Sequence, residues 1–213
     1  EFNINAAADL NKKVSTILMG HFSFNETEID HNKDGFVDMN TGRQFNAANF
    51  WQYISPKGLE MRWGVRLLDE TRSGGQITGS PYFVVSPEGL WKSEISNRRG
   101  EAFVKTGYIF KNKPGTSFGF INSFSVHELD MLFGNKTYSG LQKSFYSNFI
   151  FHSDFKDTKH QYDAGFNFIY DNVTETLIDS SWNTEEMVPG VFFQYTYTFP
   201  EKITVMAGLR EDY

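Results

Sequence analysis

The sequence has no cysteine and no long apolar run, and both absences narrow the possible folds. Without Cys, neither disulfides nor thiol chemistry holds the 213-residue chain together. No stretch approaches the ~20 consecutive apolar residues of a membrane-spanning helix, and the mean hydropathy is -0.44. A helical membrane protein is therefore excluded. A transmembrane β-barrel is not excluded, because its strands are half polar and its loops are hydrated.

Basic residues are fewer than acidic ones, and no signal peptide is recognisable in this sequence. The chain has 20 Lys and Arg against 26 Asp and Glu, which gives a net charge of -6 and an isoelectric point near 5.4. Nucleic acid is therefore not an expected partner. The first ten residues have neither the basic nor the apolar region of a signal peptide. The alternating pattern stops abruptly at Tyr213, and we therefore expect an internal piece of a longer chain.

Aromatic residues are abundant, with 22 Phe, 10 Tyr and 4 Trp. In the stretch Met187–Tyr213, every second residue from Val191 to Phe199 is apolar or aromatic, and the alternation resumes after the turn at Pro200. A period of two predicts β-strands. Each arm has about ten residues, which is enough for a tilted strand to cross a bilayer. We predict a membrane hairpin with Val191 and its apolar neighbours toward lipid and Gln194 toward the lumen.

The same alternation recurs upstream and predicts strands over residues 14–30, 44–54, 59–68, 98–110, 116–127, 141–154 and 160–171. Short turns alternate with long loops, which are expected at 31–43, 69–97, 128–140 and 172–186. Short turns on one rim and long loops on the other are typical of outer-membrane barrels, whereas a soluble sandwich has more uniform connections. We predict an all-β fold, an antiparallel transmembrane β-barrel, in which residues 1–213 form part of a single domain and supply about ten strands.

The expected loop at 31–43 begins with the oxygen spacing of a calcium site. Hard oxygen donors at loop positions one, three, five, seven and nine suit Ca²⁺, and a Gly at position six permits the sharp turn around the ion. Position twelve is Thr41 instead of the bidentate Glu of an EF-hand, so a different Ca²⁺ loop is predicted. The alternative is an acidic, solvated turn. The candidate ligands are Asp30, Asn32, Asp34, Phe36 (through its carbonyl) and Asp38.

Aromatic side chains in the expected loops form a second candidate site. They could make a platform for a bulky ligand, or they could anchor one loop to another or meet lipid headgroups. The candidates for ligand binding are Tyr82, Phe83, Trp91, Phe133, Tyr138 and Trp182. The histidines, such as His127 and His152, form no recognisable catalytic constellation, so we expect polar caps at strand ends and no enzyme.

Residues 97–110, NRRGEAFVKTGYIF, resemble the barrel region of TonB-dependent outer-membrane receptors, in particular those of the Bacteroidetes type. The likeness covers nearly the whole chain. It continues through residues 117–134 and 142–171 and ends in EEMVPGVFFQYTYTF and KITVMAGLREDY. Upstream, the segments DHNKDGFVD, FNAANFWQY and GVRLLDETRSGGQ are similar to the same family.

This resemblance implies a 22-stranded barrel in the cell outer membrane of a Gram-negative bacterium, surrounded by the lipid bilayer. It implies TonB-energised uptake of a large, scarce small molecule or metal chelate such as cobalamin, haem or a ferric siderophore. Expected partners are the inner-membrane TonB complex, reached through a plug domain, and a surface lipoprotein. The plug and the remaining strands are not within these residues. The alternatives are a soluble Ca²⁺-dependent β-rich binding module and a small outer-membrane barrel enzyme.

Overall fold

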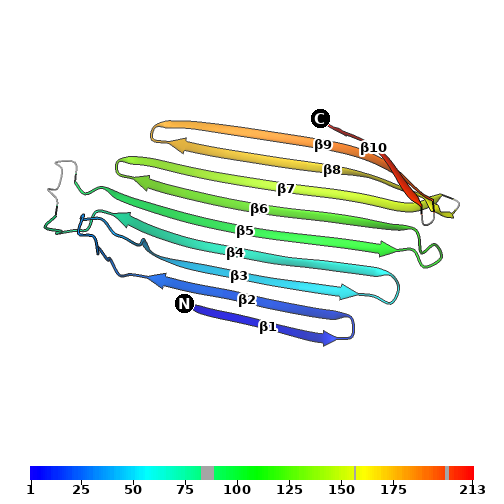
Figure 1. Ribbon diagram of the computed structural model, residues 1–213, viewed down its shortest axis with the longest axis horizontal. Coiled ribbons are helices and arrows are strands. Elements are labelled where there is room, and N and C mark those ends of the chain that lie inside the picture. The colour runs from blue at the N-terminus through cyan, green and yellow to red at the C-terminus, as the bar shows by residue number, and fades with distance from the viewer. Residues whose placement is uncertain (83–88, 156, 200–201) are drawn as a thin grey trace.

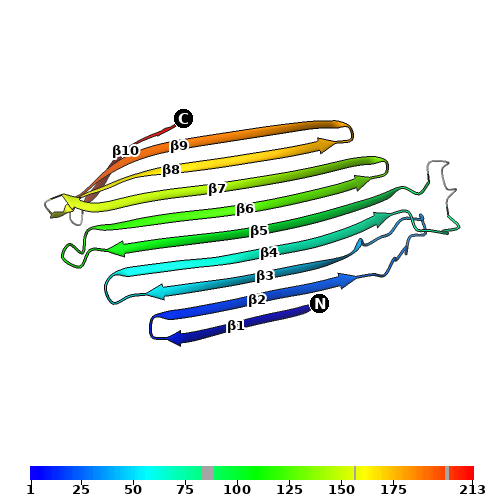
Figure 2. The same ribbon diagram turned by 180° about the vertical axis from the view of Figure 1, so that it is seen from behind.

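The computed structural model describes residues 1–82, 89–155, 157–199 and 202–213. They form one antiparallel sheet of ten strands, in which each strand pairs with its neighbours in the chain. Figure 1 shows the strands side by side in a single layer, and Figure 2 shows the same layer from behind. The predicted all-β antiparallel fold is therefore confirmed. In the described residues β1 and β10 do not pair with each other, so the sheet is open.

The strands are shortest at the two edges of the sheet. β1 and β10 have 10 residues each, whereas β7, β8 and β9 have 20 or 21. The inner strands are therefore much longer than the ~10 residues that cross a bilayer. The bounds are β1 Phe2–Asn11, β2 Val14–Asn25, β3 Thr41–Ile54, β4 Leu59–Gly75, β5 Lys92–Ile109, β6 Ser117–Phe133, β7 Lys136–Phe155, β8 Asp157–Leu177, β9 Ser180–Phe199 and β10 Ile203–Asp212.

Two of the four expected long loops are strands instead. Residues 128–140 and 172–186 continue β6 to β9 as far as two-residue turns at 134–135 and 178–179. In these stretches polar side chains such as Asp130, Ser139 and Thr176 occupy the side that carries apolar residues elsewhere in the strands. The hydrophobic alternation that reveals a strand is therefore lost, while the backbone pairing continues, for example between Ser139 and Thr176. Among the described residues, connections of more than ten residues follow only β2 (residues 26–40) and β4 (residues 76–91, of which 76–82 and 89–91 are described). We call the end of the sheet that carries them the loop end, and the opposite end the turn end.

The two faces of the sheet differ in polarity. Directly paired residues point to the same side, so Val191 shares a face with Phe166, and Phe166 with Phe149. We call this side the apolar face. From β1 to β10 it includes Ile4, Leu18, Trp51, Val65, Val104, Phe120, Phe149, Phe166, Phe193 and Leu209. The opposite, polar face includes Gln52, Arg62, Lys105, Ser125, Asn148, Asp163, Gln194 and Arg210.

The sheet has no hydrophobic core of its own. Among the described residues no apolar side chain is buried, and Val65, Phe166 and Phe193 on the apolar face are 48%, 46% and 50% exposed. Monomeric soluble proteins rarely expose contiguous apolar surface of this extent. Covering the exposed half of one such side chain would stabilise the fold by about 1 kcal/mol. The apolar face therefore needs a cover that these ten strands do not supply.

Candidate functional site

The apolar side chains of the apolar face form a band across the sheet, which is longer in β9, from Met187 to Phe199, than in β8 or β4. In β8 the band runs from Tyr162 to Tyr170, and in β4 from Leu59 to Leu67. Each stretch is about 26 Å long at the ~3.3 Å rise of a strand residue. A strand tilt of ~40° reduces this to about 20 Å in height, close to the ~25 Å apolar zone of outer-membrane barrels. We call these residues the apolar band.

Toward the loop end, charged and amide side chains replace the apolar band on the same face. Arg98 is aligned with Asp69 in β4 and with Glu128 in β6. Its Nη2 lies 3.1 Å from Glu128 Oε2 and 3.9 Å from Asp130 Oδ2. Ionised groups are expensive in hydrocarbon, so this row marks where an apolar surrounding would end. We call it the charged border; it consists of Arg43, Asp69, Arg98, Glu128, Lys143, Asn172 and Glu185.

Aromatic side chains gather where the apolar band meets the turn end. Tyr108 pairs with Leu59 and Phe118, and its ring contacts the ring of Phe118 at a centroid distance of 5.8 Å. The rings of Trp51 and Trp63 are stacked, with centroids 6.2 Å apart and planes 6° apart. Tyr and Trp are favoured where a membrane meets water, because each has an apolar body and a polar group. The turn end therefore has the composition of an interfacial zone.

The polar face carries a group of cations on β4 and β5. Arg66 Nη1 lies 3.9 Å from Glu101 Oε1, and Arg99 Nε lies 3.7 Å from Glu101 Oε2. Both cations therefore share one carboxylate. Arg62 and Lys105 lie on the same face in adjacent strands. These charged side chains therefore lie together on one side of the sheet.

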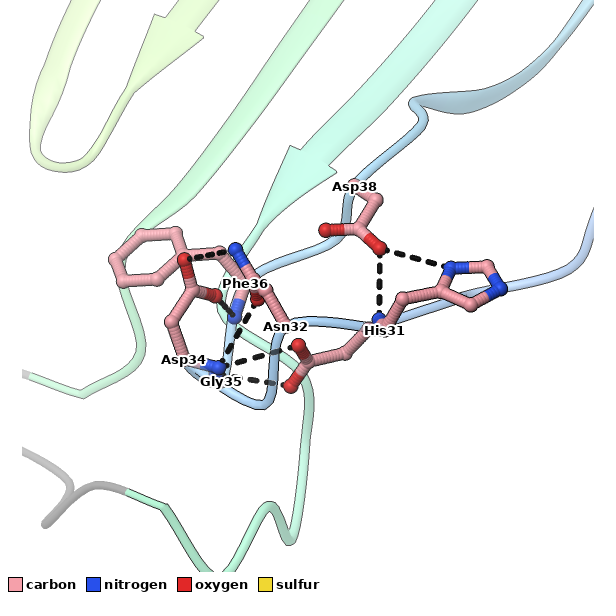
Figure 3. Close-up of polar contacts among 7 residues, drawn as sticks. His31, Asn32, Asp34, Gly35, Phe36 and Asp38 are labelled. Atoms are coloured by element: carbon pink, nitrogen blue, oxygen red, sulfur yellow. Dashed lines mark hydrogen bonds and ion pairs between the residues drawn. The ribbon is translucent and has the colours of Figure 1, made fainter.

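The acidic loop is held together by backbone amides that donate to its side chains (Figure 3). The Asp30 carboxylate accepts hydrogen bonds from the amides of Asp34 (3.2 Å) and Gly35 (2.9 Å). Asn32 accepts from the Asp34 amide at 3.1 Å, and its Nδ2 donates to Asp34 Oδ2 at 3.0 Å. Asp34 Oδ1 accepts from the amide of Phe36 at 2.8 Å. Three expected calcium ligands, Asp30, Asn32 and Asp34, thus lie together.

Asp38 lies apart from those three ligands (Figure 3). Its Oδ2 accepts hydrogen bonds from the His31 amide (2.7 Å) and interacts with His31 Nδ1 (3.0 Å). The hydrogen bond from the His31 amide has the largest effect, and together with the contact to the His31 side chain it holds the pKa of Asp38 below its usual value. The Phe36 backbone pairs with Gln76, and its ring lies 6.3 Å from that of Trp91. The acidic loop is therefore fastened to the neighbouring loop at 76–91.

The loop fits only part of a calcium shell. Ca²⁺ takes about 6–8 oxygen ligands; here Asp30, Asn32 and Asp34, with the carbonyl of Phe36, could supply some of them. Their carboxylates already accept backbone amides, although each carboxylate has lone pairs for further contacts. No cluster of three or more His, Cys, Asp or Glu in the described ranges is placed to hold a metal ion. Calcium binding stays a prediction.

Three of the aromatic candidates lie in strands instead of loops. Phe133, Tyr138 and Trp182 belong to β6, β7 and β9, and the pairing places all three on the polar face beyond the charged border. The Tyr138 hydroxyl donates a hydrogen bond to Glu175 Oε1 at 2.8 Å, which raises the pKa of Tyr138. Their expected loop position is wrong, because polar residues replace apolar ones on the other face here and the alternation that would reveal the strands is lost. Their role as ligand contacts stays a prediction.

Tyr82 and Trp91 lie in the described parts of the connection between β4 and β5. Trp91 packs between Phe36 and the turn at Gly134, where a side chain would meet the indole ring. This position supports the anchoring of one loop to another. Tyr82 is 51% exposed. Phe83 lies outside the described residues.

The histidines interact with side chains on neighbouring strands. His127 lies inside β6, where its Nε2 is 2.8 Å from Asn97 Oδ1, so the expectation of a strand-end cap is wrong for this residue. His152 Nδ1 lies 2.7 Å from Asp163 Oδ1. Ser117 is aligned with His152 in the next strand, but no hydrogen bond joins these two side chains in the described structure. Ser117 and His152 therefore lack the hydrogen bond through which a histidine activates a serine.

Sequence reasoning missed a hollow on the polar face across β1 to β5. Its volume is about 660 Å³, and its lining includes Phe50 and Phe103. The poor alternation of residues 44–54 is the signal that could have found it, because Phe50 is an apolar residue on the polar side of β3. The cross-strand contact with Phe103, by contrast, depends on the register of β4 and β5 and is not visible in the sequence.

No protein-family profile, curated protein or solved structure matches the chain. The described part of the chain has no helix with the length and apolarity required to cross a membrane.

Proposed function

We propose that this chain forms part of the wall of an outer-membrane transport barrel of the TonB-dependent receptor kind. The observation that carries the proposal is the apolar band, which runs across all ten strands, lacks a cover and stops at the charged border. Lipid would cover the apolar face, and the polar face would line a water-filled lumen. The antiparallel connections and the open edges of β1 and β10 suit continuation by further strands.

In this proposal the chain contributes to uptake by shape and charge. The strands that continue beyond the charged border would carry the loops at 26–40 and 76–91 away from the membrane surface. Those loops and the polar face would contact the transported molecule. The resemblance of the sequence supports a large nutrient such as cobalamin, haem or a ferric siderophore, with energy delivered by TonB through a plug.

The positions of the four tryptophans allow a direct test of the lipid contact. Trp51 and Trp63 lie on the apolar band, whereas Trp91 and Trp182 lie toward the loop end. One double variant would keep Trp51 and Trp63 and have Phe at the other two positions; the second would keep Trp91 and Trp182 and have Phe at positions 51 and 63. Both would be reconstituted into bilayers whose acyl chains carry bromine. Bromine quenches tryptophan only at short range, so the variant that keeps Trp51 and Trp63 should lose most of its fluorescence and its counterpart little.

Equal quenching of the two double variants would contradict the proposed orientation. A stable monomer in buffer without detergent would contradict the membrane location altogether and favour the soluble alternative. Recovery of fluorescence on unfolding in urea would show that the quenching depends on the folded sheet.

We also propose that Ca²⁺ orders the acidic loop at the loop end. Asp30, Asn32 and Asp34 would hold the ion through their side-chain oxygens, because they already lie together. Calorimetric titration should show saturable heat that Asp34→Asn abolishes. Asp38→Asn is the matched control and should retain most of the heat, since Asp38 is directed toward His31. Absence of heat in the unmodified protein would overturn the calcium proposal without affecting the membrane one.

A further inference from the structure

The hollow across β1 to β5 has the size and lining of a small-molecule site. Its volume of about 660 Å³ lies within the ~300–1,000 Å³ of such sites. The rings of Phe50 and Phe103 lie in it with their centroids 5.8 Å apart, and the amide of Gln52 is beside them. Its charged lining residues are Arg62, Arg66, Lys105 and Asp9.

The cations of this hollow are only partly compensated. Arg62 and Lys105 are direct cross-strand partners on the polar face, and like charges in this arrangement repel each other. Arg62 Nη2 lies 2.8 Å from Glu60 Oε1. For Lys105, by contrast, no described carboxylate lies within ion-pair distance; its Nζ lies 5.8 Å from the centroid of the Phe103 ring. The lining of the hollow thus carries more cations than carboxylates, whereas the chain as a whole has a net charge of -6.

We propose that this hollow binds a flat organic carboxylate. The carboxylate would lie between Arg62 and Lys105 and accept charge-assisted hydrogen bonds from both, which would offset their repulsion. The flat apolar part would rest on Phe50 and Phe103, where aromatic rings offer a large contact area. Arg66, whose guanidinium carbon already lies 5.3 Å from the centroid of Phe50, would close one side. The inference rests on the proposed function only in requiring that the polar face meets water.

Benzoate is a suitable probe, and benzamide is its neutral counterpart of the same shape. Ligand-observed NMR on the full-length protein in detergent micelles should show saturable binding of benzoate and none of benzamide. Lys105→Gln should weaken benzoate binding about tenfold, the value expected for the loss of one charge-assisted hydrogen bond. Lys143→Gln is the matched control, because Lys143 lies on the opposite face of the sheet. It should bind benzoate as tightly as the unmodified protein.

Equal binding of benzoate and benzamide would overturn the proposal, as would equal weakening by the two lysine variants. Absence of saturable benzoate binding would overturn it too. Far-UV circular dichroism must show the same strand content in all variants. Phe103→Leu provides a second test, because it leaves every charge in place and should still weaken benzoate. These binding results can be interpreted even if the bilayer quenching experiment contradicts the proposed membrane orientation, because they are measured in detergent micelles.

Discussion

A lysine in the middle of the apolar band should impair assembly far more than a lysine at the next position. Phe193 lies midway between Phe199 and Met187, the two ends of the apolar stretch of β9. It is therefore about 20 Å along the strand from each end, or about 14 Å in height at a tilt of ~45°. That places Phe193 near the midplane of the bilayer. A Lys on the lipid side at that depth destabilises an outer-membrane barrel by roughly 2–4 kcal/mol.

The measurement is an equilibrium urea titration of the protein in phospholipid vesicles, followed by tryptophan fluorescence. The free energy of unfolding of Phe193→Lys should fall by roughly 2–4 kcal/mol. The matched variant is Gln194→Lys, which places the same side chain on the polar face opposite Asp163. A charge pair there is worth about 0–1 kcal/mol, so this variant should be neutral or slightly more stable. Similar losses in both variants, or no loss in either, would refute the assignment of the two faces.

Three further predictions concern the packing and the loops. Gly165→Ala should lower the free energy of unfolding by about 1–3 kcal/mol, because the added methyl group would meet the backbone oxygen of Phe149; urea titration measures this. Ile178→Asn should raise that free energy by about 1 kcal/mol, since Ile178 has φ 57° in the turn between β8 and β9. The lowered pKa of Asp38 means that its bond to His31 stabilises the loop above the ordinary Asp pKa of 3.8 and is lost as the pH falls through the lowered value. Asp38→Asn should therefore speed hydrogen exchange of the His31 amide at neutral pH, and unchanged exchange would contradict the role of that contact.

The sequence was sufficient to predict the two faces of the sheet. Period-two alternation arises wherever one side of a strand meets an apolar surrounding and the other meets water, as at Leu59 to Leu67 in β4. Arg66 and Glu101 occupy polar positions of the alternation in β4 and β5, and the structure brings them within 3.9 Å of each other. These predictions need only the geometry of a single strand, because a side chain's face is fixed by its position along that strand.

The strand ends and the contacts between loops could not be predicted in the same way. Beyond the charged border the apolar face carries polar residues, so Thr174 and Thr176 look like loop residues although they are paired in β8. The bridge between Phe36 and Gln76 joins residues that are distant in the chain. In the acidic loop, Asp30, Asn32 and Asp34 lie together and Asp38 lies apart, because of the particular backbone amides to which each side chain is hydrogen-bonded. Such contacts are set by the positions of two segments relative to each other, which local patterns do not contain.

The order of the strands has a consequence for how the protein folds. Because every strand pairs only with its neighbours in the chain, each hairpin can form after closing a single connection, and the entropic cost of closing a loop grows only slowly with its length, even for the longer connections after β2 and β4. The sheet can therefore grow one hairpin at a time. Meanwhile the outermost strands, β1 and β10, keep a row of unpaired amide and carbonyl groups along one side. In a barrel, the pairing of the last free edges is the only step that must bring distant parts of the chain together, and we expect that step to be the slowest.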